Sequence, residues 1–157
     1  MKRTLLLGLL VLGLVAVVVA AADFSGTWVL NKEKSDQQPG RGGGPAGPPP
    51  DQTLVIKQSG NDLSMTRTMN MGGQERTMPE VKYTLDGKEV KSEGRGGPSV
   101  AKATVEGDTI VIATTRTTQQ GEMTTKEVYA LSDGGKVLTI TRTMGDRPAT
   151  KQVFDKK

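Results

Sequence analysis

Short segments in which apolar and polar residues alternate, separated by glycine-containing turns, run through the chain from Phe24 onward. Successive side chains of a strand point to opposite faces, so this alternation is typical of strands that bury one face. The turns at Gly60-Asn61 and Asp86-Gly87 carry residues that favour tight reversals between antiparallel strands. The pattern therefore predicts an all-β domain built from consecutive antiparallel strands.

The predicted strands are short and follow one another at close intervals. They cover residues 24–31, 52–59, 63–69, 81–85, 89–93, 100–105, 109–118, 123–131, 137–144 and 150–154. Strands joined in this way form an up-and-down meander, and an open sheet of that size would leave two unprotected edges. We therefore expect about 8–10 strands that close into a barrel.

Residues 1–22 have the composition of a secretory signal peptide. A basic start precedes an unbroken apolar run from Leu5 to Val19, and three alanines follow it. We expect a signal-peptide helix that is cleaved after Ala22 or after Ala20, leaving a secreted or periplasmic protein with no stable membrane anchor. The alternative is an uncleaved anchor, because the apolar run is at the lower limit for crossing a bilayer. Attachment of the bacterial lipoprotein type needs a cysteine, and the chain has none.

Residues 23–157 are enough for one domain with one core. Within them, residues 37–51 read QQPGRGGGPAGPPPD, in which glycine and proline fill most positions. Such a composition disfavours helix and ladder strand alike, so we expect a surface loop between the first two strands. A lid over the barrel mouth or a polyproline docking segment is the alternative.

The charge of the chain argues against polyanionic partners. Lys2 and Arg3, two of the 21 basic residues, lie in the predicted signal, which contains none of the 17 acidic residues. The remaining chain therefore has a net charge of only +2, against +4 for the full sequence. So small a charge on strands of mixed sign predicts neither nucleic-acid binding nor attachment to an anionic membrane.

The chain contains no histidine and no cysteine. These absences exclude structural zinc sites and catalytic triads built on histidine, and they leave no disulfide framework. The carboxylates that remain belong to no recognisable catalytic motif, and the glycine-rich stretch at 40–47 lacks the helix and the Lys-Ser/Thr of a phosphate loop. We therefore expect no catalytic residues, no metal site and no cofactor.

The segment Phe24-Ser25-Gly26-Thr27-Trp28 carries a family resemblance. Its Gly-x-Trp on the first strand resembles the opening motif of the lipocalins and the wider calycin group, and its Phe-x-Gly-x-Trp resembles the start of the fatty-acid-binding proteins. With Lys34-Ser35-Asp36 and the later run at 131–140, the chain looks like the small exported bacterial lipocalin-like proteins, a mostly uncharacterised family. The resemblance implies a barrel closed at one end by Gly26 and Trp28, with a basic residue of the last strands, Arg142 or Lys151, over the indole.

Three arginines are the leading candidates for contacts to a ligand. Two similar heptapeptides at 63–69 and 138–144 place Arg67 and Arg142 in phase with the apolar residues of their strands, and Arg116 has the same phase in its strand. Inward guanidinium groups would suit an anionic headgroup through paired hydrogen bonds. The alternative is that they extend to solvent at the rim or pair with acids of neighbouring strands, for which the candidates are Glu75, Glu122 and Glu127.

Methionines accompany these arginines. Met65, Met69 and Met144 share the phase of Arg67 and Arg142, and flexible thioethers can line an adaptable apolar cavity or serve as core filler. The Arg-x-Tyr with which fatty-acid-binding proteins hold a carboxylate is matched here only by Arg142-Thr143-Met144.

Two functions follow from this sequence. The first is a non-enzymatic protein that holds a small apolar or amphipathic ligand, anionic or neutral, inside the barrel. The second is a closed, ligand-free structural or protein-interaction module of the cell envelope. Interior side-chain size separates the two, because small inward residues such as Ala103, Ala113 and Thr114 would leave a cavity.

Overall fold

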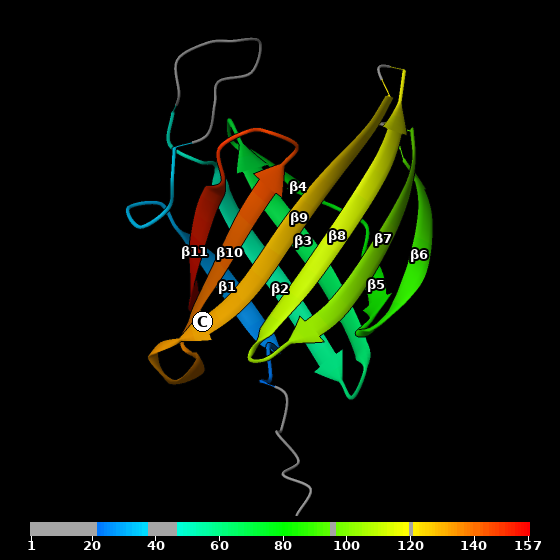
Figure 1. The fold of residues 1–157 in the computed structure, drawn as a ribbon. Helices are drawn as coiled ribbons and strands as arrows, with labels where there is room; N and C mark the ends of the chain where they lie inside the picture. The colour runs from blue at the N-terminus through cyan, green and yellow to red at the C-terminus, as the bar shows by residue number, and fades with distance from the viewer. Residues whose placement is uncertain (1–21, 38–46, 95–96, 120) are drawn as a thin grey trace, which may run out of the picture.

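A computed structural model describes residues 22–37, 47–94, 97–119 and 121–157 of the chain. These residues form strands β1 Gly26–Asn31, β2 Asp51–Ser59, β3 Asp62–Met71, β4 Gln74–Thr77, β5 Val81–Thr84, β6 Asp86–Gly94, β7 Gly97–Glu106, β8 Thr109–Thr118, β9 Gly121–Ser132, β10 Val137–Met144 and β11 Thr150–Lys156. One short 3-10 turn, Asp133–Gly135, joins β9 to β10. The predicted antiparallel meander is therefore confirmed (Figure 1).

Hydrogen bonds connect the strands in the order β4-β3-β2-β1-β11-β10-β9-β8-β7-β6, and β5 also pairs with β3. The first and last strands are neighbours, with Val29 opposite Asp155. The sheet therefore curls until its two ends, β4 and β6, face each other across one seam (Figure 1).

One chain segment joins the two sides of this seam. β4 and β5 both run along β3, with the Met78 N–H donating to the Arg67 carbonyl between them. After β5 the chain turns at Leu85, which is buried and whose N–H donates to the Asn61 carbonyl at 2.8 Å. β6 then pairs with β7 on the other side. The barrel is thus joined at the Leu85 corner, while β4 and β6 remain the two ends of the ladder.

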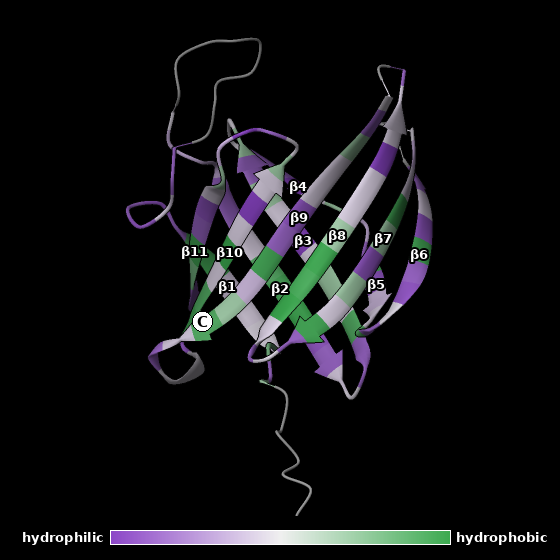
Figure 2. Ribbon diagram, viewed as in Figure 1, coloured by the Kyte–Doolittle hydropathy of each residue, from purple (hydrophilic) through white to green (hydrophobic). Residues whose placement is uncertain are grey.

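The large buried apolar side chains come from the strand halves that lie toward the start of β1, which is at the bottom of Figure 1. Figure 2 shows the same division in hydropathy, with the lower half of β8 hydrophobic and its upper half polar. The most deeply buried of these side chains are Phe24, Trp28, Leu54, Ile56, Ile110, Ile112, Tyr129, Leu138, Ile140 and Phe154. A single packed core therefore occupies the lower half and leaves the upper half to other residues.

Trp28 lies in the core at the lower end of the barrel, and its basic partner is Lys156. The Lys156 ammonium lies 5.1 Å from the centroid of the indole. The indole is fully buried, and its Nε1 donates to the Phe24 carbonyl at 3.0 Å. The expectation of Arg142 or Lys151 over this ring was wrong, because the β1–β11 register places Trp28 opposite Lys156.

Some expectations fall outside the described residues. The predicted signal peptide lies there except for Ala22, and so do residues 38–46 of the predicted loop. The short strand β4 had no predicted counterpart, since all four of its residues are exposed and carry no apolar alternation. Among the described residues, no helix is long and apolar enough to cross a membrane.

Candidate functional site

Two adjoining cavities occupy the polar half of the barrel interior. The first, here the Tyr129 cavity, has a volume of about 210 Å³ and is lined by Leu54, Met65, Arg67, Met78, Pro79, Val81, Tyr83, Glu127, Tyr129 and Arg142. The second, here the Arg116 cavity, has a volume of about 230 Å³ and is lined by Thr114, Arg116, Met123, Thr125, Glu127, Arg142 and Met144. Glu127 and Arg142 line both, so these two residues stand where the cavities meet.

The three predicted arginines all reach these cavities. Each is the centre of a Thr-Arg-Thr triplet, in β3, β8 and β10. Since side chains alternate between faces, the threonines on both sides of an inward arginine point outward. Two outer threonines of neighbouring strands, Thr115 and Thr124, share a hydrogen bond of 3.0 Å. The structure therefore brings Arg67, Arg116 and Arg142 around one interior, as their phase predicted.

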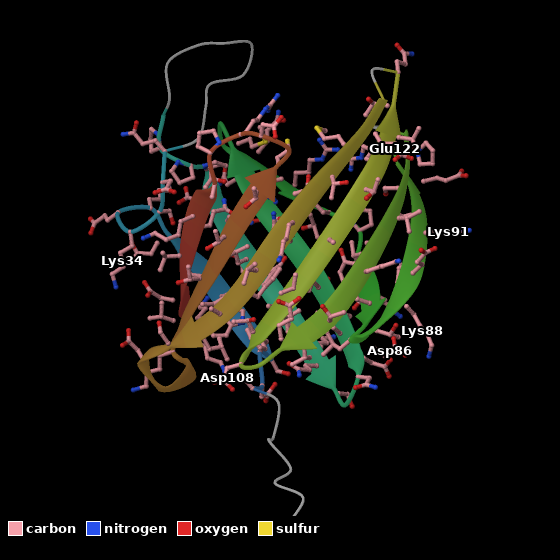
Figure 3. All side chains as sticks on the ribbon, in the orientation of Figure 1. Lys34, Asp86, Lys88, Lys91, Asp108 and Glu122 are labelled. Atoms are coloured by element: carbon pink, nitrogen blue, oxygen red, sulfur yellow. The ribbon has the colours of Figure 1, made fainter. Side chains whose placement is uncertain are left out.

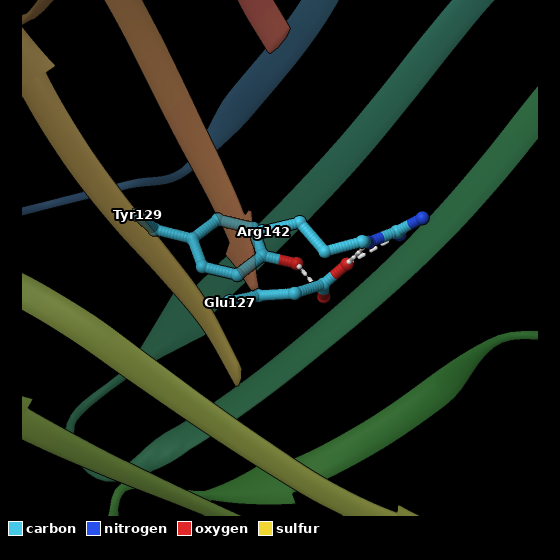
Figure 4. Close-up of polar contacts among 3 residues, drawn as sticks. All are labelled: Glu127, Tyr129 and Arg142. Atoms are coloured by element: carbon cyan, nitrogen blue, oxygen red, sulfur yellow. Dashed lines mark hydrogen bonds and ion pairs between the residues drawn. The ribbon is translucent and has the colours of Figure 1, made fainter. Parts of the chain in front are cut away.

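Arg142 is held by Glu127 of the neighbouring strand, its direct partner in the β9–β10 ladder. Arg142 Nε donates to Glu127 Oε1 at 2.7 Å, and an Nη of the same guanidinium donates to that oxygen as well. The Tyr129 hydroxyl donates to the other carboxylate oxygen, Oε2, at 2.9 Å (Figure 4). Pairing with an acid was the alternative to ligand contact for these arginines, and for Arg142 the structure shows that pairing.

The electrostatic surroundings of Glu127 favour its ionised form. Burial by itself would raise the pKa of this carboxyl. The positive charges of Arg142 and Arg67, and the hydrogen bonds from Arg142 and Tyr129, outweigh burial and lower the pKa below its usual value. Glu127 is therefore a stable anion inside the barrel at neutral pH.

Both tyrosines of the chain face this anion, and both are held in the neutral form. Burial, with the nearby Glu127 charge, raises the pKa of Tyr83. The same two causes raise the pKa of Tyr129 well above its ordinary value. The two phenols are thus permanent hydrogen-bond donors and acceptors on the cavity wall.

The guanidinium groups of Arg67 and Arg116 have no hydrogen-bond or ion-pair partner among the described residues. Arg67 is half-buried in the Tyr129 cavity, opposite Leu54 in the ladder, whereas Arg116 is exposed at the end of β8. Among the described residues that line the two cavities, one carboxylate therefore stands against three guanidinium groups, an excess of positive charge.

The predicted methionines are placed unevenly. Met65 lines the Tyr129 cavity and Met144 lines the Arg116 cavity. Met69 lines neither of them and lies opposite Gln52 in the β2–β3 ladder. Met78 and Met123 line one cavity each.

Two of the three small residues whose orientation separates the two functions point inward. Ala103 is buried in the core cluster and Thr114 lines the Arg116 cavity. Ala113 does not, and it lines an outer hollow with Lys102 and Thr115. Adjacent strand residues face opposite sides, so Ala113 and Thr114 cannot both point inward.

Gln52 is a polar residue of the interior that the sequence did not single out. It is only 4% exposed, and its Nε2 is the one buried side-chain polar atom without a partner in the described part of the chain. On β2 it shares the face of Leu54 and Ile56. A buried amide without a partner is costly, so this donor is available to a bound polar group or a water molecule.

A larger hollow, of about 540 Å³, lies where β2, β3 and β5 meet. Its lining includes Lys57, Ser59, Asp62 and Lys82, all of them exposed, and none of the three arginines. A large volume does not by itself indicate a binding site, and this hollow lacks the convergent buried polar groups of the two interior cavities. Across the described ranges, no three Asp or Glu side chains gather in a way that would hold a metal ion.

Solved structures resemble this fold over most of the chain. Secretory abundant heat soluble protein 4 of Ramazzottius varieornatus superposes with a TM-score of 0.66 at 14% identity, over 85% of this chain and 94% of that one. Lipid binding protein 8 of Caenorhabditis elegans gives 0.63 at 13% identity, over 88% and 100%. Fatty-acid-binding protein 1 of Echinococcus granulosus gives 0.57 at 17% identity, over 85% and 96%.

These similarities show that the fold is an antiparallel barrel of the calycin type, the kind found in fatty-acid-binding proteins. Comparison of the sequence with protein-family models and with curated proteins found no match.

Tyr129 is the contact that reasoning from the sequence missed, and Glu127 was only one of three candidate acids. A signal for both exists in β9, where Met123, Glu127 and Tyr129 share one phase. A glutamate among apolar residues of a single phase indicates an inward acid that needs a partner.

Proposed function

We propose that this protein binds a small amphipathic molecule with a single anionic group, and that it does so without catalysing a reaction. The apolar part of the ligand would lie against Leu54, Met65 and Met78, and the anionic group against Arg67. The observation that carries the proposal is the half-buried Arg67 guanidinium, which lines a cavity and forms no ion pair within the described part of the chain.

The cavities limit the size of the ligand. Pockets for drug-sized molecules usually measure about 300–1,000 Å³. The Tyr129 cavity and the Arg116 cavity are each smaller, at about 210 and 230 Å³, but they adjoin at Glu127 and Arg142. A short-chain molecule, or one that extends through both cavities, fits them best.

The fold supports the same function. Structures similar to this one include proteins that are named for binding lipids or fatty acids. The partly empty interior also favours a ligand over the ligand-free module, whose interior would be filled by side chains.

Calorimetric titration with decanoate and with 1-decanol tests the proposal, since the two probes share one chain length and differ in charge. We expect the wild-type protein to bind decanoate more tightly than decanol, and Arg67→Met to remove most of that difference. Lys91→Met is the matched control, because Lys91 projects outward from β6 (Figure 3). If neither probe binds at micromolar concentration, or if Arg67→Met leaves the ratio of affinities unchanged, the proposal fails.

We further propose that the chain is exported and acts outside the cytoplasm. The support is the basic, apolar and alanine-ending pattern of residues 1–22. After expression of the full chain in a bacterium, N-terminal sequencing of the protein from the periplasmic fraction should begin at Asp23 or at Ala21. Recovery with Met1 intact, in the cytoplasm or the membrane, would refute it.

A further inference from the structure

We propose that Glu127 is the specificity-determining residue of the cavity: it occupies Arg142 and Tyr129 as an internal carboxylate and so directs the anionic group of a ligand to Arg67. This inference rests on the proposed function and specifies its anion site. It predicts that Arg142, although it lines both cavities, contributes little to ligand binding.

Both oxygens of the Glu127 carboxylate already accept hydrogen bonds. Two nitrogens of Arg142 donate to Oε1, and the Tyr129 hydroxyl donates to Oε2. The Glu127 side chain is 16% exposed and the Arg142 side chain 36%. A ligand acid that sought Arg142 would therefore have to displace a carboxylate that is already bound at both oxygens, with no gain in the number of ion pairs.

A ligand acid at the Arg142 position would also meet repulsion. Like charges in a partly buried site cost much more than in water, because the effective dielectric constant there is lower. Glu127 stays ionised, so it disfavours any second carboxylate in contact with Arg142.

Arg67 is the remaining guanidinium of the Tyr129 cavity at which an anionic group can bind. It lines the Tyr129 cavity from β3, together with Glu127 and Arg142 from β9 and β10, and its charge acts on Glu127. Apolar side chains flank it in the same cavity: Leu54, Met65 and Val81. An anionic group at Arg67 thus gains an unpaired cation and keeps its apolar chain in contact with an apolar wall.

Charge removal at Glu127 tests this assignment. In Glu127→Gln the shape of the side chain is kept and Arg142 is released, so the cavity gains a second free guanidinium. We expect decanoate to bind at least about tenfold more tightly than to wild type, the effect of one added hydrogen bond to a charged group. The affinity for 1-decanol should change less than about twofold.

Glu122→Gln is the matched control, since Glu122 lies on the same strand and lines the outer hollow (Figure 3). It should leave both affinities unchanged. If Glu127→Gln leaves the ratio of decanoate to decanol affinity at the wild-type value, the inference is wrong. If neither probe binds to wild type or to Glu127→Gln, it is the proposed function that fails.

A double variant keeps the test decisive if the single variant folds poorly. Glu127→Gln with Arg142→Met removes both members of the pair and leaves no unpaired charge between them. We expect this protein to keep the wild-type preference for decanoate, because Arg67 remains. Loss of the preference would show that Arg142 holds the ligand acid directly and would overturn the inference.

Discussion

Lys156 lies across the indole of Trp28, with its ammonium nitrogen 5.1 Å from the ring centroid and its side chain open to solvent. The ring below it is fully buried. A cation over an aromatic face is attracted by the ring's quadrupole, and the aliphatic part of a lysine covers apolar surface at the same time. This contact joins the last strand to the first at the closed end of the barrel.

Replacing Lys156 should weaken the barrel modestly. We expect Lys156→Ala to lower the free energy of unfolding by about 0.5–1 kcal/mol, the range for an exposed cation–π contact. Trp28 is the only tryptophan, so its fluorescence during urea unfolding reports the change without interference. Lys157→Ala, at an exposed neighbour outside this contact, is the control. Equal stabilities of the two variants would mean that the contact contributes nothing.

Gly26 should tolerate a side chain poorly, and Lys156 should be part of the reason. The φ of Gly26 is +150°, and a Cβ added to this residue would lie 2.6 Å from Lys156 Cε. We expect Gly26→Ala to cost about 1–2 kcal/mol, from backbone strain and from displacement of the lysine.

The two causes can be separated by a double-mutant cycle measured by urea unfolding. In the Lys156→Ala background the clash is absent, so Gly26→Ala should cost less there. Gly60→Ala, at a turn glycine with φ +57° and open space around it, should cost the same in both backgrounds. Strict additivity of Gly26→Ala and Lys156→Ala would rule out the steric part.

The Glu127 ion pair should make stability depend on acid pH. The folded protein lowers the pKa of Glu127 below its ordinary value of 4.5, so the stabilisation is complete above that value and is lost as pH falls through the folded pKa. At pH 7 we expect Glu127→Gln to be about 1–2 kcal/mol less stable than wild type. Urea unfolding at a series of pH values should show this difference shrinking below pH 4.5. A difference that stays constant into strong acid would contradict the assignment.

The tyrosines should resist ionisation. The pKa values of Tyr83 and Tyr129 are raised above 10.0, so the stability that their neutral forms contribute is present below pH 10 and is lost as pH rises through the folded values. Absorbance at 295 nm, which follows tyrosinate, should therefore stay low through pH 10 and rise first for Tyr83.

Removal of the Glu127 charge should shift this titration downward, because that charge raises the pKa of both phenols. Tyr83→Phe isolates Tyr129, and Glu122→Gln is again the control that should change nothing. The titration midpoint of Tyr129 is compared between Tyr83→Phe and the double variant Tyr83→Phe with Glu127→Gln. If the two midpoints are equal, the Glu127 charge does not act on the Tyr129 phenol.

The alternation of apolar and polar residues was enough to predict the meander and the inward phase of Arg67 and Arg142, because both depend only on the order of residues along a strand. The partners of inward residues depend on register, which local pattern does not contain. Arg142 faces Glu127, and not Glu75 or Glu122, because the turn after β9 sets the β9–β10 alignment. In the same way, the register of β11 on β1 places Lys156 at the closing tryptophan.

The seam at Leu85 has a mechanical consequence. Elsewhere around the barrel, neighbouring strands are tied by ladders of hydrogen bonds, whereas β4 and β6 are the two free ends of that ladder. The upper part of the seam can therefore widen or narrow without the loss of a ladder bond, while the Leu85 corner and the Trp28–Lys156 closure keep the lower part fixed. Distances between spin labels at Glu75 and Lys91, one on each side, would report such a change. The separation of the two sides in the cavity half can thus change while the printed strand pairings stay intact.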